Sequence, residues 1–425
     1  MLRRACEPGR WRAARDVVSA GAVACAACTS GGPVRGGPTP ATTADARIAR
    51  VSLGIVPTAA LSATGAWTLT DHSGRVVASG GARDRIALSS ARTVLRLTDQ
   101  RGSTRDLGAP VALVVASKEG AIVNDRRYRG ELAFTPADSG VHIINRVPLE
   151  AYLRGVVPRE IGIRALGERA AVEAQAVAAR SYAFTRLANA SRAYDLAATT
   201  SDQVYGGMDA ENAVADAAVA ATEGLVLQYA GRVVSAPYHS TCGGSTAEPA
   251  EVWRSRSEPF LQRVSDRIPG SDRYYCDIAP RFRWERTWRA DTLTAIVGRY
   301  LRNYSSVAAG PLGTVRGISV DGRTASGRVA AILIETDGGQ HRVQANDIRY
   351  VLRSSGGELL NSTYFSPEVV PTTDGRLARL TIRGLGYGHG VGMCQWGAIG
   401  RARAGQDFRT ILRTYFPGTS VARAY

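Results

Sequence analysis

Lysine is almost absent from this chain of 425 residues. Lys118 is the single lysine, so arginine supplies all the other basic side chains among the 53, and the 37 acidic residues leave a formal charge of +16. Such a bias toward arginine can reflect a GC-rich coding sequence as much as a functional requirement. The arginines form no dense basic block and do not alternate with aromatic residues, which argues against a nucleic-acid-binding protein. The positive charge permits attraction to an anionic membrane or to an anionic wall polymer, but it does not distinguish between these two partners.

Long apolar runs are also missing beyond the N-terminus, so we expect no transmembrane helix there. With 44% hydrophobic and 21% charged residues, the chain is too apolar for a disordered polyelectrolyte and too polar for a multi-span membrane protein. We therefore expect a buried core and about two or three domains.

The first 28 residues have the composition of an export signal. Five arginines between Arg3 and Arg15 precede an uncharged apolar run at 17–27, which is too short to span a bilayer and is typical of a signal-peptide core. The run ends at Cys25 and Cys28, and residues 29–46 are rich in Gly, Pro and Thr, as in a flexible tether. The pattern resembles a bacterial lipoprotein signal with lipidation, and hence membrane anchoring, at Cys28 or at Cys25; an ordinary secretory signal is the alternative.

Three cysteines remain after the signal: Cys242, Cys276 and Cys394. In an oxidising compartment this number predicts one disulfide and one free thiol, or a metal site. His239 and Cys242 have His-x-x-Cys spacing, so zinc bound by His239, Cys242 and Cys276 is one hypothesis. We favour a Cys242–Cys276 disulfide, because the sequence does not reveal a set of four ligands.

Residues 47–143 are expected to form a β-rich region. Alternating apolar runs at 67–71, 76–79, 94–98 and 111–115 are separated by Gly, Asp and Ser, a pattern that predicts strands joined by hairpins. These strands carry no cluster of acids, bases or nucleophiles. We interpret the region as a scaffold or a substrate-positioning module.

Helical periodicity begins near residue 145. Apolar residues at 149, 152, 153 and 156 predict a short helix that Pro158 ends, with Glu160 just after the break. An alanine-rich helix is predicted over about 165–190. It contains Gln175 and Arg180, which must find partners if buried and therefore either brace the helices or point into a site.

The remaining pattern mixes helices and strands. We predict helices over about 211–222, 291–304, 398–404 and 408–415, a hairpin turning at Ala230-Gly231, and strands near 282–288 and across 315–343. Five glycines between Gly384 and Gly392 predict a loop whose backbone closely approaches another group.

Four segments together resemble the SpoIID/LytB family of bacterial cell-wall proteins. They are V-P-L-E-A-Y-L-R-G-V-V-P-R-E at 147–160, A-Q-A-V-A-A-R-S-Y-A at 174–183, Y-H-S-T-C-G-G at 238–244, and G-Y-G-H-G-V-G-M-C-Q-W-G-A at 386–398, in the family's order. The resemblance implies an α+β fold, with a mixed α/β domain of SpoIID/LytB type at 144–425 behind the β-rich region. It also implies an exported protein of the cell envelope.

The family includes a sporulation protein that acts like a lytic transglycosylase on glycan strands stripped of stem peptides, and proteins described as amidase enhancers. The resemblance thus implies cleavage of denuded MurNAc-GlcNAc strands to 1,6-anhydro ends. The alternative is a non-catalytic, glycan-binding enhancer of an N-acetylmuramoyl-L-alanine amidase. Peptidoglycan strands, a cell-wall amidase and the membrane are the expected partners, and nucleic acid is not.

The family's catalytic acid closes the V-P-x-E motif, which here is Glu160. Hydrolysing glycosidases need two carboxylates. A lytic transglycosylase uses the sugar's own 6-hydroxyl as nucleophile, so one Glu serves as acid and then as base. The apolar neighbours Val156, Val157 and Ile161 are expected to raise the pKa of Glu160.

The matched motifs imply further residues that bind substrate or organise the site: Gln175, Arg180, Tyr182, His239, Tyr387, His389 and Gln395. His389 lies in the glycine-rich loop, whose backbone groups suit carbohydrate hydroxyls. The family commonly has Ser where this chain has Cys394. A nucleophilic Cys394 with His389 as its base is a less favoured hypothesis. Apart from the zinc alternative, no cofactor is expected.

Overall fold

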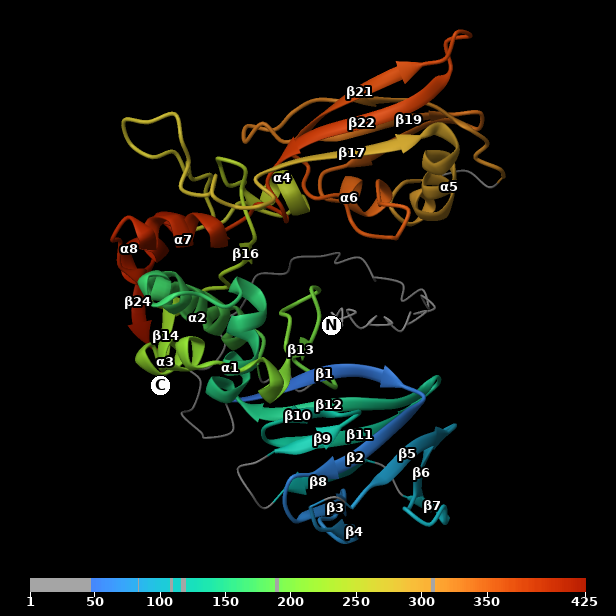
Figure 1. Ribbon diagram of the computed structural model, residues 1–425, viewed down its shortest axis with the longest axis vertical. Coiled ribbons are helices and arrows are strands. Elements are labelled where there is room, and N and C mark those ends of the chain that lie inside the picture. The colour runs from blue at the N-terminus through green and yellow to red at the C-terminus, as the bar shows by residue number, and fades with distance from the viewer. Residues whose placement is uncertain (1–46, 83, 108–109, 116–119, 188–190, 307–309) are drawn as a thin grey trace, which may run out of the picture. The chain divides into compact units, whose positions relative to one another are not determined.

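The computed structural model describes residues 47–425 except 83, 108–109, 116–119, 188–190 and 307–309. The expected export signal, the candidate lipidation sites Cys25 and Cys28, and the linker 29–46 lie outside the described residues. The described chain contains both helices and strands, with strands alone before α1, and this confirms the α+β class (Figure 1). None of the helices in this part of the chain is long and apolar enough to cross a membrane.

Two antiparallel-rich sheets account for the N-terminal region. The first has the strand order β13-β1-β12-β11-β8-β3-β4 and the second β10-β9-β2-β5-β6-β7. The four predicted strands correspond to β3, β4, β6 and β8. The strands are β1 (Ile48–Val56), β2 (Thr58–Ala63), β3 (Trp67–Asp71), β4 (Val76–Gly80), β5 (Ile86–Ala91), β6 (Val94–Thr98), β7 (Thr104–Leu107), β8 (Val111–Val115), β9 (Ala121–Val123), β10 (Arg126–Tyr128), β11 (Glu131–Ala137), β12 (Gly140–Pro148) and β13 (Leu196–Ala197).

The β12 strand leads directly into the helices that carry the site. These are α1 (Leu149–Ile161), α2 (Arg169–Phe184), which follows the short 3-10 helix η2 (Leu166–Glu168), and α3 (Ala213–Ala221), which follows η3 (Gly207–Ala210). The prediction that Pro158 ends the first helix is wrong, because α1 continues through it to Ile161. Proline removes a single backbone donor in this last turn, and the helix ends where Gly162 takes a φ of 77°.

The C-terminal elements pack with these helices. The predicted hairpin is present as β14 (Leu225–Tyr229) and β15 (Arg232–Val233), with positive φ at both Ala230 and Gly231, and β14 also pairs with β24 (Ser420–Arg423). The parallel pair β16 (Tyr238–His239) and β23 (Met393–Cys394) joins two distant motifs. The helices here are α4 (Pro249–Trp253), α7 (Gln395–Arg403) and α8 (Phe408–Tyr415).

Residues 283–385 build a second hydrophobic core, separate from the larger one. Two three-stranded sheets, β17-β22-β21 and β18-β19-β20, surround it with two helices. The elements are β17 (Arg283–Arg289), α5 (Ala290–Tyr300), η4 (Leu301–Asn303), β18 (Val315–Val320), β19 (Ala331–Thr336), β20 (Gly339–Gln344), α6 (Asp347–Val351), β21 (Phe365–Pro371) and β22 (Leu377–Leu385). The sequence did not separate this region from the rest of 144–425.

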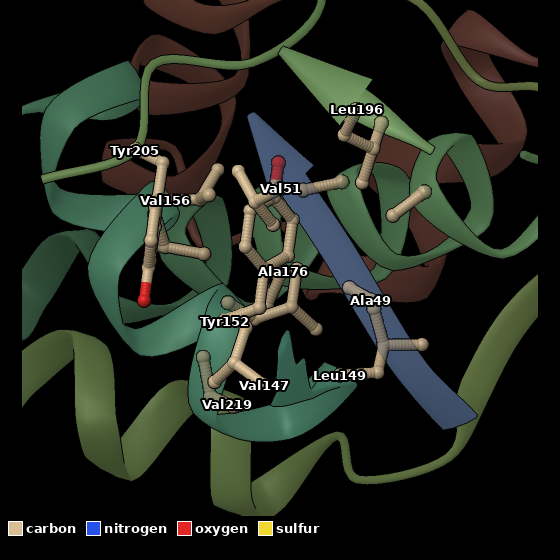
Figure 2. Packing of buried hydrophobic residues seen from close by; sticks show 14 of the residues in the cluster. Ala49, Val51, Val147, Leu149, Tyr152, Val156, Ala176, Leu196, Tyr205 and Val219 are labelled. Atoms are coloured by element: carbon tan, nitrogen blue, oxygen red, sulfur yellow. The ribbon is translucent and has the colours of Figure 1, made fainter. Parts of the chain in front are cut away.

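The larger core joins the β-rich region to the helices. Figure 2 shows part of it, with Tyr152 and Val156 of α1, Val51 of β1 and Ala176 of α2, none of which is exposed to solvent. The buried face of α2 consists largely of alanine, so α1 approaches it closely. The last turn of α1, with Glu160, is therefore fixed by packing on several sides.

Candidate active site

Glu160 lies in the last turn of α1, mostly buried. Its Oε1 accepts a hydrogen bond of 2.6 Å from the backbone N–H of Val204, and the Tyr238 hydroxyl donates a second bond to the carboxylate. Burial raises the pKa of Glu160 from 4.5 to about 7, although both hydrogen bonds lower it. Near neutral pH the carboxyl is therefore present in both protonation states.

A chain of side-chain hydrogen bonds reaches Glu160 from the core. The Tyr152 hydroxyl donates to Oε1 of Gln203 at 3.1 Å, and Nε2 of Gln203 donates to the Tyr238 hydroxyl at 2.9 Å. The Tyr238 hydroxyl is thus left to donate its own proton to Glu160. We call Glu160, Tyr152, Tyr182, Gln203 and Tyr238 the Glu160 site.

The segment that supplies Gln203 and Val204 is anchored to both α1 and β12. The Tyr205 hydroxyl donates to Oδ1 of the buried Asn145 at 2.9 Å, and the N–H of Gly206 donates to the carbonyl of Gly155 in α1 at 3.0 Å. A Cβ at residue 155 would lie 2.5 Å from the Tyr205 ring, so only glycine permits this approach. The N–H of Val204 is consequently held in a fixed position against Glu160.

Tyr182, a predicted site residue, lies within electrostatic reach of Glu160. Burial raises the pKa of Tyr182, and the charges of Arg186, Asp202 and Glu160 act on it as well. Its hydroxyl donates to Asp202 at 2.9 Å, and Arg186 lies over its ring at 3.4 Å from the centroid. Asp202 is held further by the N–H of Ala197, so this neighbouring acid has its own set of partners.

His389 contacts the site through backbone groups. Its Nε2 donates to the Tyr238 carbonyl at 2.8 Å, while Nδ1 accepts from the N–H of Val391 at 3.1 Å. Burial, together with the charge of Arg349, lowers its pKa to about 3. Because both ring nitrogens are engaged with the backbone, His389 does not serve as a base for Cys394. The centroid of its ring lies 5.0 Å from the ring centroid of the half-exposed Trp253. The sequence did not single out this tryptophan as part of an aromatic surface.

The other predicted site residues fall in three places. Arg180 is fully buried and donates two 2.7 Å bonds to Glu150, so it braces α2 against α1. Gln175 and Gln395 are buried and bond to each other at 3.2 Å, which joins α2 to α7. The backbone of Tyr387 pairs with Thr241, and Arg281 lies over the Tyr387 ring. Their roles toward substrate stay predictions.

The cysteines are arranged differently from either sequence hypothesis. The Sγ atoms of Cys242 and Cys276 are 3.4 Å apart and both cysteines are free thiols, so the expected disulfide is not formed. The ligand atoms of Cys242, Asp266, Cys276 and Cys394 all lie within 4.8 Å of one another, and we call these four residues the cysteine cluster.

His239 does not belong to the cysteine cluster: its ring nitrogens are not among the ligand atoms that lie within 4.8 Å of one another, and its Nδ1 bonds to the Val391 carbonyl. The pKa of His239 lies well below its ordinary value, since the ring is buried and next to His389 and Arg328. The ligand set expected for zinc therefore changes: Cys242 and Cys276 come together, whereas His239 is replaced by Asp266 and Cys394.

Sequence reasoning missed several members of these groups. Tyr152 and Tyr238 stand inside two of the matched motifs, at 147–160 and 238–244, and this position within the motifs was the available signal. Gln203, Val204 and Asp266 carry no local signal, because long-range packing alone brings them to their sites.

Comparison with known proteins decides the family. Residues 137–229 match the family model described as Stage II sporulation protein. The chain is 31% identical over 315 residues to an uncharacterized protein of Brachyspira hyodysenteriae, which covers 73% of this chain and 76% of that protein. The chain belongs to the SpoIID/LytB family.

Two SpoIID/LytB relatives have descriptive names. The chain is 31% identical over 302 residues to the Amidase enhancer of Bacillus subtilis (strain 168), covering 63% of this chain but 40% of that longer protein. It is 26% identical over 297 residues to Stage II sporulation protein D of the same strain, covering 66% and 76%. Residues 271–392 also match a domain of unknown function, which overlaps the second core.

Proposed function

We propose that this SpoIID/LytB protein is a lytic transglycosylase that cleaves denuded MurNAc-GlcNAc strands of the bacterial cell wall. The observation that carries the proposal is Glu160, a mostly buried carboxyl whose pKa is raised to about 7. A group that must first donate and then accept a proton works best with a pKa near the ambient pH. The resemblance of the V-P-x-E motif points to the same residue.

The reaction needs one carboxyl group and no water. Protonated Glu160 donates its proton to the glycosidic oxygen as the bond from that oxygen to C1 of MurNAc breaks. The ionised carboxylate then takes the proton of the 6-hydroxyl of the same MurNAc while O6 bonds to C1. The products are a 1,6-anhydro-MurNAc end and a free hydroxyl on GlcNAc, and Glu160 is again protonated.

The surroundings of Glu160 support a mechanism with one carboxylate. The Val204 N–H and the Tyr238 hydroxyl both stabilise the ionised form, which the second half of the reaction requires as its base. The neighbouring acid, Asp202, is bound by the Tyr182 hydroxyl and by the N–H of Ala197, and not by Glu160. A hydrolysing glycosidase places its second carboxylate beside the first, about 5–10 Å away.

The test is to incubate the purified full chain with denuded glycan strands and to identify 1,6-anhydro ends by mass spectrometry. Glu160→Gln should keep glycan binding and lower the rate of product release by about 10²–10⁴-fold. Glu223→Gln, the same change at an exposed carboxyl, is the matched control and should retain the wild-type rate. Activity of Glu160→Gln within tenfold of wild type would contradict the proposal.

A second function is favoured by one comparison. The relative named Amidase enhancer is 31% identical to this chain over 302 residues. If this chain stimulates an amidase without cleaving glycan, neither the wild type nor Glu160→Gln will produce anhydro ends, and both will accelerate a purified N-acetylmuramoyl-L-alanine amidase equally.

We further propose that the protein is exported to the cell envelope and anchored there by lipidation of Cys28 or Cys25. The formal charge of +16 would then retain it near anionic wall and membrane polymers. Retention near the substrate is a separate role from the chemistry, which depends on one acidic side chain.

A further inference from the structure

The cysteine cluster collects four acidic groups in the protein interior. Cys242, Cys276, Cys394 and Asp266 are each 0% exposed. Cys242 follows β16, Asp266 and Cys276 both lie in the connection between α4 and β17, and Cys394 ends β23 just before α7. Burying so many ionisable groups together is costly unless a cation or a set of hydrogen bonds compensates.

The distances within the cluster fit one small cation. Zinc binds cysteine sulfur at about 2.3 Å in a tetrahedral arrangement, which places ligand sulfurs about 3.8 Å apart. The Sγ of Cys242 lies 3.4 Å from the Sγ of Cys276 and 3.5 Å from Oδ2 of Asp266. A disulfide between two of the cysteines would leave the third thiol and the carboxylate without a role.

Hydrogen bonds around the cluster orient the ligand atoms. The Sγ of Cys394 accepts N–H bonds from Cys242 and Gly397 at 3.2 and 3.3 Å, which fix the position of this sulfur at the start of α7. Oδ1 of Asp266 accepts from the Tyr415 hydroxyl at 2.7 Å and from Arg401 at 3.0 Å. Oδ2 of Asp266 is thereby turned toward the sulfurs, as outer-shell partners orient the ligands of metal sites.

The close approach of α7 also depends on glycine at residue 397. A Cβ at this position would lie 2.0 Å from the Tyr415 hydroxyl and 2.1 Å from Oδ2 of Asp266. The helix terminus, the carboxylate and the tyrosine therefore fit together only without a side chain there.

Two buried arginines balance the charge that a loaded site would have. Three thiolates, one carboxylate and Zn²⁺ sum to −2. Arg401 is 7% exposed and pairs with Asp266, and Arg328 is 2% exposed and donates to the carbonyls of Cys242 and Ser245. Two positive charges thus accompany the site inside the protein.

We propose that Cys242, Asp266, Cys276 and Cys394 bind one Zn²⁺ as a closed, four-ligand structural site. Sulfur-rich tetrahedral sites select zinc, and four protein ligands leave no open position for a substrate. The ion would tie together three parts of the chain: Cys242, the connection between α4 and β17 that holds Asp266 and Cys276, and Cys394. This site is distinct from the site of the proposed glycan cleavage, because Glu160 is not among its ligands.

The test measures metal, not activity. Full chain carrying Cys6→Ser, Cys25→Ser and Cys28→Ser retains only the three cluster cysteines. Purified without chelator and dialysed, it should contain about one zinc per chain by inductively coupled plasma mass spectrometry. Three thiols should become reactive only when a mercurial reagent releases the metal. Reloading with Co²⁺ in place of zinc should give the intense visible absorption of a tetrahedral, sulfur-ligated ion.

Two matched variants separate this ligand set from the alternatives. Cys394→Ser keeps the size of the side chain and should weaken zinc binding by about 100-fold or more, whereas His239→Ala should retain one zinc per chain. Loss of zinc in His239→Ala with full zinc in Cys394→Ser would overturn the proposal. A metal-free wild-type chain with a Cys242–Cys276 disulfide, seen by peptide mass spectrometry without reduction, would overturn it as well.

Discussion

Glu160→Gln should make the folded protein more stable above neutral pH. The pKa of Glu160 is about 7 in the folded protein and 4.5 in its ordinary state, so folding shifts it by 7 − 4.5 = 2.5. One pKa unit corresponds to about 1.36 kcal/mol, so ionised Glu160 lowers the free energy of unfolding by about 3 kcal/mol. Glutamine carries no charge and can still accept the Val204 N–H.

The sign of the pH dependence follows from the proton balance. Between pH 4.5 and 7 the folded chain holds the Glu160 proton more often than the unfolded chain does. The contribution of this group to the free energy of unfolding is therefore greatest below pH 4.5, falls as the pH rises to about 7, and stays low above it. The difference between variant and wild type must grow across the same range.

Urea unfolding at pH 4.5 and pH 8.5 measures the effect. The two proteins should differ little at pH 4.5, and Glu160→Gln should be more stable by up to about 3 kcal/mol at pH 8.5. The control Glu223→Gln should show no such pH-dependent gain. An equal loss of stability at both pH values would refute the assignment of Glu160 as a buried acid with a raised pKa.

Three further substitutions test the contacts around these groups. Tyr238→Phe removes a hydrogen bond to the Glu160 carboxylate, so it should raise the pKa of Glu160 by about one unit and move the alkaline limb of the pH–rate profile upward. The Tyr182 hydroxyl bonds to Asp202 and not to Glu160, so Tyr182→Phe should leave the alkaline limb in place. Arg180→Leu leaves the Glu150 carboxylate without its buried partner. It should therefore lower the free energy of unfolding, measured by urea titration, by about 3 kcal/mol. Lost activity at unchanged stability would instead assign Arg180 to the active site.

Periodic segments were the predictable part of the fold. The strands β3, β6 and β8 and the hairpin turn at Ala230-Gly231 follow from alternation and turn chemistry, which act over a few residues. Pro158 misled the prediction of α1 because a local rule for ending helices was overridden by packing on both sides of the last turn. The second core at 283–385 was not predicted, because it is defined by the packing of strands and helices against one another and not by a local pattern.

The site was predictable only where a motif named its central residue. Glu160 follows from the V-P-x-E motif, but its raised pKa depends on burial that involves elements outside that motif. Val204, whose N–H bonds to Glu160, lies 44 residues after it in the sequence, and Gln203 precedes Val204 directly. The bond from Tyr205 to Asn145 holds this segment in place. Asp266 is likewise brought to the Sγ of Cys242, 24 residues before it, by the fold and not by a motif.

The parallel pair β16 and β23 connects the two sites. Tyr238, which bonds to Glu160, pairs with Met393, and the next residue pairs with Cys394. A pair of two-residue strands has few ladder hydrogen bonds and is weak by itself. In the proposed zinc site, Cys394 within the pair and Cys242 just after β16 bind the same ion, which would hold both strands in register. Tyr238 would then keep its hydroxyl bonded to Glu160. Loss of the metal would therefore lower catalysis by displacing Tyr238, whereas Glu160→Gln would lower it with the metal still bound.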